Sequence, residues 1–507
     1  MNQVAPSHAS EVRLETRKYL LPIACVMVSI PVLAIAIVLE FIPSISLLTL
    51  LLFGAAAGFA LWGTGRNTDI LHPVRVFGCV WCFCLALASL RLTTNISHWE
   101  PPMWGYVLAA LACFIAGFWL ATRVLTRLRG GRPTRPWGGL PSSELLAPRR
   151  TLVVAVICLA VGVGALAFEY REIEGIPIFA QNIDLARTQF ASPIGRSSTE
   201  FHTLFYKSIS VLSLFCKYAV YLACIALFQT VRKSRLQLAI AIGVVVGSFL
   251  AVASQGSRGA LFELLIVGLA LFHYLRRRLR LKEVAMFGVA LILFISIAGY
   301  WRGAVGNPSA AYVGAQRISN LPQGEVWDWL ATGNFTLTAS LEVFYRLTQD
   351  LPALRRPSAG FLFYPILRRF VPRENIQQLA AGLYTTMMIT PTFLGEFYAD
   401  FGLLGVLLGP AVLGFLYGYV YYRARRQDSS YWLCINAIFL LLLVYFPYVN
   451  LFSQTLTWIF DVVQMAWLIK LSQVRRAEST LRAGRASVGN SVYQVQKPAL
   501  PSARRAG

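Results

Sequence analysis

The stretch "LAIAIGVVVGSFLAVASQGSRGALFELLIVGLALFHYL", residues 238–275, contains two apolar runs joined by a short polar segment, Ser254–Gly259. A single helix over residues 237–275 would be about 58 Å long, which is too long to cross a bilayer once. Basic segments flank the pair, "VRKSRLQ" before it and "RRRLRLK" after it. Because both flanks should lie on the cytoplasmic side, the chain is predicted to cross twice and to turn at Ser254–Gly259 on the outer side.

The same apolar pattern continues through most of the chain. Of the 507 residues, 56% are hydrophobic and 14% are charged, and the mean hydropathy is +0.59. Apolar helices of about 20 residues span a bilayer, because every backbone group in lipid must bond within its own segment. The sequence therefore predicts an all-α, polytopic membrane protein. The predicted transmembrane helices, about twelve in number, are 19–39, 41–62, 74–95, 102–122, 151–170, 203–228, 237–253, 260–275, 284–300, 396–422, 430–449 and 454–472.

The formal net charge of +23 follows the membrane topology. With the N-terminus inside, seven segments face the cytoplasm, and they hold 31 of the 46 Lys and Arg residues. This excess is the positive-inside signature, so nucleic acid is excluded as the expected partner. Residues 1–18 are predicted to form a cytoplasmic N-terminus, residues 19–472 the transmembrane domain, and residues 473–507 a basic cytoplasmic tail without stable structure.

Two segments on the predicted outer side are longer than ordinary connections, residues 171–202 and 301–395. Long loops with a periodicity of their own are commonly functional. In the second one, "NFTLTASLEVFYRLTQD" and "FLFYPILRRFVP" are predicted to be short amphipathic helices at the membrane interface. The first of these has residues near helical spacing at Phe335, Leu341, Phe344, Tyr345 and Thr348.

Arg258, in the turn between the paired spans, is the first candidate site residue. An arginine at membrane depth costs at least about 2.5 kcal/mol at the bilayer centre, and it commonly marks function. Guanidinium groups bind phosphate oxygens bidentately, and carboxylates four residues apart share one helical face. Arginines and carboxylates together on the outer side therefore suit an anionic substrate with a hydroxyl to deprotonate. The other candidates on the outer side are Arg302, Arg187, Arg346, Glu396, Asp400 and His202.

Other polar or small residues are interpreted structurally. Lys217 and Asp461 lie within predicted spans and are expected to pair with each other. Small residues let membrane helices approach closely, so five glycines are assigned to helix packing. These are Gly402, Gly405, Gly409, Gly414 and Gly418. Cysteines inside spans behave as small hydrophobic residues, so no metal site is expected.

Three segments resemble the Wzy-type, or O-antigen, polymerases, the family that joins oligosaccharide repeat units. The segments are "SQGSRGAL", "GIPIFAQNIDLARTQF" and "PTFLGEFYADFGLLGVLLGPAVLGFLYG". The twelve-span layout and the large loop before the tenth span are similar to that family as well.

The resemblance implies a GT-C-like glycosyltransferase in the bacterial inner membrane, with both termini cytoplasmic and with no cofactor. Its substrates would be polyprenyl-diphosphate-linked oligosaccharides, and its partners membrane lipids and a chain-length regulator. A leaving diphosphate needs cationic stabilisation, which Arg258, Arg302, Arg187 and Arg346 would supply. The acceptor hydroxyl needs a general base. Glu396 is the first candidate for the base, followed by Asp400 and His202.

Two other functions stay open. An O-antigen ligase or another lipid-linked glycan transferase would share the architecture and the donor. A transporter or flippase for lipid-linked sugars belongs to a different class, and it would carry repeated halves and polar residues at several midplanes. The polar chemistry of this chain is instead concentrated at the outer end, which favours the polymerase.

Overall fold

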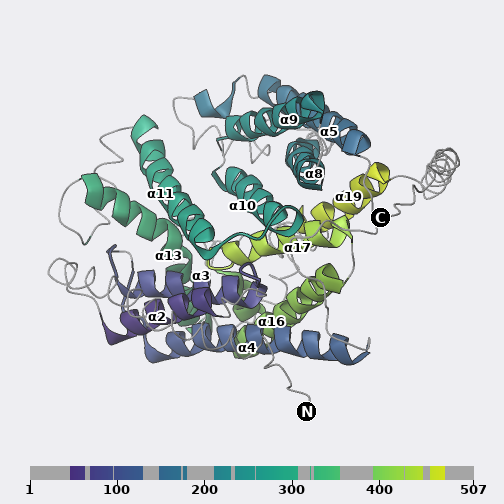
Figure 1. Ribbon diagram of the computed structural model, residues 1–507. Helices are drawn as coiled ribbons and strands as arrows, with labels where there is room; N and C mark the ends of the chain where they lie inside the picture. The colour runs from purple at the N-terminus through teal and green to yellow at the C-terminus, as the bar shows by residue number, and fades with distance from the viewer. Residues whose placement is uncertain are drawn as a thin grey trace, which may run out of the picture.

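The computed structural model describes 13 parts of the chain and is all-α within them (Figure 1). The described residues are 46–62, 69–94, 96–128, 148–172, 175–179, 211–229, 234–256, 258–306, 320, 325–353, 392–426, 429–448 and 457–473. Twelve α-helices and one short 3-10 helix, η1 (Pro177–Phe179), lie in these parts. The all-α prediction is confirmed for them.

One group of helices consists of α5 (Pro148–Glu172), α8 (Phe215–Gln229) and α9 (Arg235–Ser254), which lie together at the top of Figure 1. Local sequence signals set where these helices begin. Proline stands at the first position of α5, where its missing N–H costs no hydrogen bond. Before α9, the Ser234 side chain accepts from the backbone N–H of Gln237 and the Gln237 side chain accepts from the backbone N–H of Ser234.

A second group consists of α2 (Leu47–Leu61), α3 (Pro73–Ser89), α4 (Pro101–Leu128) and α16 (Phe393–Arg426), which lie at the bottom of Figure 1. Within this group, α4 packs most extensively against α16. A Cβ atom on Gly414 would collide with the Phe114 carbonyl, and one on Gly418 would lie 2.8 Å from the Ala121 Cβ. The packing role predicted for these two glycines is confirmed.

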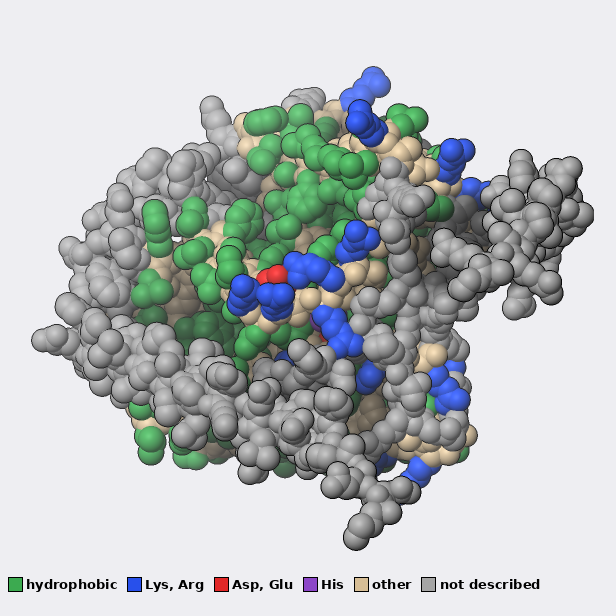
Figure 2. Space-filling model, in the orientation of Figure 1, with side chains coloured by type: hydrophobic (Ala, Val, Ile, Leu, Met, Phe, Trp, Pro, Cys, Tyr) green, Lys and Arg blue, Asp and Glu red, His purple; other side chains and the backbone are tan. Residues whose placement is uncertain are grey.

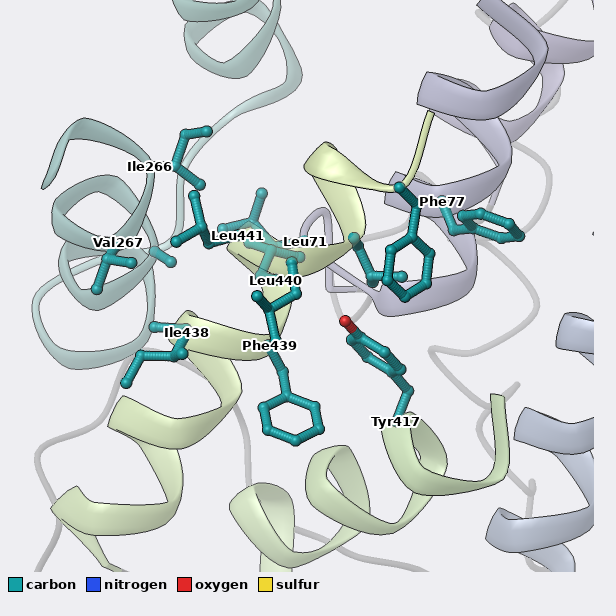
Figure 3. Packing of buried hydrophobic residues seen from close by; sticks show 14 of the residues in the cluster. Leu71, Phe77, Ile266, Val267, Tyr417, Ile438, Phe439, Leu440 and Leu441 are labelled. Carbon is teal, nitrogen blue, oxygen red and sulfur yellow. The ribbon is translucent and has the colours of Figure 1, made fainter. Parts of the chain in front are cut away.

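Three helices lie between these groups: α10 (Arg258–Leu275), α17 (Ser430–Tyr445) and α19 (Thr457–Ser472). Of these, α17 is the central helix of the core, buried on all sides through most of its length. Figure 3 shows Ile438 and Leu441 of α17 beside Ile266 and Val267 of α10, and Phe439 directed towards Tyr417 of α16. The core is thus continuous from α10 through α17 to α16.

The last two helices, α11 (Leu281–Gly306) and α13 (Glu325–Ala353), pack against each other along one side of the molecule. The α13 helix lies inside the predicted outer loop 301–395. Instead of a short amphipathic helix it is one helix of 29 residues, buried all round at residues 338–345. "FLFYPILRRFVP" lies outside the described residues.

The chain is a multi-pass membrane protein. Each predicted span except 19–39, which lies outside the described residues, overlaps a described helix. Figure 2 shows hydrophobic side chains over a broad area of one face, with Lys and Arg gathered at the connection between α10 and α11. Five described helices are long and apolar enough to cross a membrane: Pro101–Leu128, Pro148–Arg171, Val211–Gln229, Arg235–Ser254 and Phe393–Arg426.

The contacts between helix ends agree with the predicted alternation of the spans only in part, because Phe77, near the predicted cytoplasmic end of span 74–95, contacts Phe446, near the predicted outer end of span 430–449. Each of six contacts joins two ends that are predicted to lie on the same side. On the predicted cytoplasmic side the pairs are His273 with Asp69, Gln229 with Ser430, and Arg423 with Trp432. On the predicted outer side they are Tyr170 with Ser254, Tyr445 with Gly259, and Phe393 with Phe446.

Candidate functional site

The turn between α9 and α10 is the first part of the candidate site, and the structure confirms where it was predicted. The chain reverses at Gly256, whose φ of 66° is a conformation that favours glycine. The Ser254 hydroxyl donates to the Ala251 carbonyl at 2.6 Å and accepts from the Tyr170 hydroxyl at 2.5 Å. Arg258 is then the first residue of α10. Arg258 therefore follows this turn at the first position of a helix.

The end of α17 connects this turn to α16. The Tyr445 hydroxyl donates to the carbonyl oxygen of Gly259, beside Arg258, at 2.9 Å. The next residue, Phe446, accepts a hydrogen bond of 3.1 Å from the backbone N–H of Phe393 and stacks on its ring at 4.5 Å. Two consecutive residues of one helix end thus hold the start of α10 and the start of α16.

Glu396 and Asp400 lie on the first, short part of α16. Both side chains are buried, and the helix start is supported by the Thr392 hydroxyl, which accepts from the Leu394 N–H at 3.3 Å. The predicted span 396–422 is not one straight helix, because the backbone breaks at Gly402 with φ 57° and ψ −138°. The assignment of Gly402 to packing alone is wrong, since its conformation turns the Glu396 segment back on the helix that follows.

The glycines after this break make the reversal possible. A Cβ on Gly405 would collide with the Phe397 carbonyl, and one on Gly409 would lie 2.5 Å from the Phe397 ring. The first part of α16 therefore lies directly against the second part, with the Phe397 carbonyl at Gly405 and the Phe397 ring at Gly409. The packing role predicted for Gly405 and Gly409 is confirmed, and it serves to place Glu396 and Asp400.

Arg346 lies on α13 and is bonded within the protein. Its Nε donates to Glu342 Oε1 at 3.0 Å. Glu342 is buried and also accepts from the backbone N–H of Ser97 at 3.2 Å, from the Ser97 hydroxyl, and from Trp99 Nε1 at 2.9 Å. Glu342 thus joins the connection between α3 and α4 to α13, a contact that the sequence did not predict.

The α13 helix also contacts the two elements on either side of it. The Tyr398 hydroxyl, on the same short helix as Glu396, donates to the Thr348 carbonyl at 3.5 Å. On α11, Ser296 lies beside Gly333 of α13, and a Cβ atom on Gly333 would collide with the Ser296 hydroxyl. Arg302 follows Ser296 within α11, because that helix continues past the predicted end of the span at residue 300 to Gly306.

The helices that carry Arg258, Glu396, Arg346 and Arg302 are therefore joined in sequence by direct contacts. The shared site predicted for these four residues stays a prediction. Arg187 and His202 lie outside the described residues.

A cluster of four buried or half-buried residues, which we call the Lys217 cluster, lies beside α10. The Lys217 ammonium is 2.8 Å from Asp461 Oδ1 and 3.0 Å from Oδ2, which confirms the expected pair. The Tyr218 hydroxyl donates to Asp461 at 2.7 Å. Glu263, 3.7 Å from Lys217, is the fourth member, and it was missed although it stands in the stretch that predicts the fold. An acidic residue inside an apolar helix was the available signal.

A second polar cluster lies at the other end of α10. His273 Nδ1 accepts from the Leu279 N–H at 3.1 Å, so Nε2 carries the proton and donates to Asp69 Oδ1 at 3.0 Å. Burial alone would raise the pKa of Asp69, but the hydrogen bonds from His273 and from the Leu71 N–H hold it below its usual value. In the part of the chain that the structure describes, three His, Cys, Asp or Glu side chains do not gather in a way that could hold a metal ion.

The family comparison matches the part of the chain that contains Glu396. Residues 337–446 match the family described as "Putative O-antigen polymerase". The match begins within α13 and ends at Phe446, so it includes Glu342, Arg346, Glu396 and Asp400, and it covers about a fifth of the chain. The resemblance found in the sequence is confirmed over these residues. No curated protein and no solved structure matches the chain.

Proposed function

We propose that this protein polymerises polyprenyl-diphosphate-linked oligosaccharide repeat units into O-antigen or a related surface polysaccharide. The observation that carries the proposal is the family match over residues 337–446, which ends at the residue that holds Phe393 in place. The protein is a twelve-span, GT-C-like enzyme of the bacterial inner membrane with both termini cytoplasmic. Its site is at the periplasmic end, where α9 turns into α10.

The proposed reaction is a glycosyl transfer between two lipid-linked molecules. The bond between the first sugar of the growing chain and its diphosphate breaks, and the terminal sugar hydroxyl of the incoming unit bonds to that carbon. Arg258, Arg302, Arg187 and Arg346 stabilise the charge that develops on the diphosphate. Glu396 accepts the proton of the attacking hydroxyl, with Asp400 and His202 as the alternative bases.

The structure supports these roles in two ways. Glu396 and Asp400 are on a short helix that is fixed at both ends, by Phe446 at its start and by the break at Gly402. Preorganised groups are what transition-state stabilisation requires. Arg258 stands at the N-terminus of α10, where the helix dipole adds to its positive charge. The proposed roles use side chains of this chain and no cofactor. The proposed partners are lipid-linked substrates, membrane lipids and a chain-length regulator.

The length profile of the surface polysaccharide tests the proposal. A strain that lacks this protein should carry glycan of at most one repeat unit on its surface, and the cloned protein should restore long chains. An O-antigen ligase would give a different result, because its loss would remove single units as well. If the protein were a flippase, its loss would leave lipid-linked units on the cytoplasmic face. Either of these results would overturn the polymerase proposal.

A further inference from the structure

The two carboxylates of the Lys217 cluster, Asp461 and Glu263, differ in how they are bonded. Asp461 receives two contacts from Lys217 and one from the Tyr218 hydroxyl, at 2.7–3.0 Å. The contact between Glu263 and Lys217 is 3.7 Å, beyond hydrogen-bond distance. The Glu263 side chain is 27% exposed, against 9% for Lys217 and 11% for Asp461. Asp461 therefore anchors the ammonium, and Glu263 is the accessible member.

The position of Glu263 places the cluster close to the turn. Glu263 is four residues after Gly259, so both lie on the same face of α10, about 6 Å apart along its axis. That face is the one on which Tyr445 bonds to Gly259. The accessible carboxylate thus lies about one helical turn below the start of α10, on the side facing α8 and α17.

An ionised pair with one open side is costly in a membrane unless another group completes it. Asp461 already balances the charge of Lys217, so Glu263 adds a second negative charge to a largely buried place. A stable fold would be served better by an apolar residue here. The arrangement suits a ligand group that can donate a hydrogen bond to the carboxylate and accept one from the ammonium, which a hydroxyl can do.

We propose that Glu263 is a substrate-binding residue, whose carboxylate accepts a hydrogen bond from a sugar hydroxyl of the lipid-linked substrate. Lys217 is the positioning residue, held in place by Asp461 and 3.7 Å from the Glu263 carboxylate. This inference rests on the proposed polymerase function and adds a contact to the site, apart from the proton acceptor Glu396. In this inference, the face of α10 that lies towards α8 and α17 holds the sugar.

The test uses the full-length protein in proteoliposomes with lipid-linked repeat units extracted from a strain that lacks it. Glu263→Gln keeps the size of the side chain but loses its charge, so the KM for the extracted units should rise about tenfold or more, as expected for a lost hydrogen bond to a charged group. The kcat should change much less. Glu283→Gln is the matched control, because it makes the same substitution at the start of α11, outside the Lys217 cluster, and should leave KM unchanged.

The outcomes separate this inference from the proposed function. If the wild-type protein adds no units, the polymerase function itself fails. If the wild type polymerises and Glu263→Gln has the wild-type KM, the function stands and the role of Glu263 is overturned. If Glu263→Gln does not fold, Glu263→Asp decides, since it keeps the charge but shortens its reach. A stable Glu263→Asp protein with a raised KM supports binding, and one with a wild-type KM contradicts it.

Discussion

The Tyr445 hydroxyl donates a hydrogen bond of 2.9 Å to the carbonyl oxygen of Gly259, across 186 residues of sequence. The next residue, Phe446, holds Phe393 by stacking and by a backbone hydrogen bond. The end of α17 is therefore the element that fixes the distance between the Arg258 turn and the Glu396 helix. We expect the proposed activity to depend on this contact.

Replacing Tyr445 by Phe should reduce polymerisation with a small loss of stability. The substitution keeps the ring and removes one hydrogen bond, worth about 1 kcal/mol. We expect the thermal midpoint of the purified protein to fall slightly and the polysaccharide to become shorter. Tyr431→Phe, at the other end of α17, is the control and should leave chain length normal. Equal chain lengths in the two variants would show that the contact has no role in activity.

Glu396→Gln tests the proton acceptor. The amide keeps the shape of a buried side chain but cannot take a proton from the acceptor hydroxyl, so the rate should fall about 100-fold or more. The protein should still insert and unfold at a normal temperature. Asp400→Asn should have a smaller effect. If Glu396→Gln is active and Asp400→Asn or His202→Ala is not, the role of base passes to that residue.

The features that the sequence predicted have local signals. Apolar runs with basic flanks mark the spans, and the glycines of "SQGSRG" mark the turn, which Gly256 confirms. The resemblance likewise depended on short segments, and residues 337–446 confirm it where it includes Glu396.

The features that were missed depend on contacts between distant parts of the chain. The polar residues of α13 suggested a surface helix, yet Glu342 is buried because Ser97 and Trp99 supply its hydrogen bonds. The break in α16 follows from the fit of Phe397 against Gly405, which no local pattern shows. Burial of a charged side chain can be predicted only when its partners are known.

Gly402→Ala should destabilise the protein. The φ of 57° with ψ −138° is a conformation that an L side chain rarely adopts, so alanine should cost about 1–3 kcal/mol. We expect a thermal midpoint lower by several degrees and a loss of activity, because the Glu396 helix would move. Gly54→Ala is the control, since a Cβ there meets no atom within 4 Å. A Gly402→Ala protein as stable and active as Gly54→Ala would contradict the role of this break.

His72 should make stability depend on pH at the predicted cytoplasmic end. Burial against the Phe118 and Tyr421 rings, at 4.9 and 4.8 Å, lowers the pKa of His72 from 6.5 to about 4. A lowered histidine pKa means that the unfolded chain binds the proton more readily, so this contribution is complete above pH 6.5 and is lost as the pH falls towards 4.

The measurement is the thermal midpoint of purified protein between pH 7 and pH 4. His72→Phe should decline less over this range than the wild type, because phenylalanine has no proton to bind. His98→Phe replaces an exposed histidine and should follow the wild-type curve. The groups near His72 are Asp69, Arg75 and Arg425, and none of them is changed in either variant. Equal slopes for wild type and His72→Phe would contradict the prediction.

Arg258 decides whether the turn binds a diphosphate. Arg258→Ala should abolish chain extension at a normal protein level, since a leaving diphosphate would lose its cationic partner. Arg258→Lys keeps the charge but not the planar fork, so it should restore extension only in part. Arg276, exposed just after the other end of α10, gives the matched control, and Arg276→Ala should extend chains normally. A contact with lipid headgroups predicts another pattern, in which lysine replaces arginine fully and alanine mainly lowers the amount of protein. Long chains from a well-expressed Arg258→Ala strain would show that this turn does not hold the diphosphate.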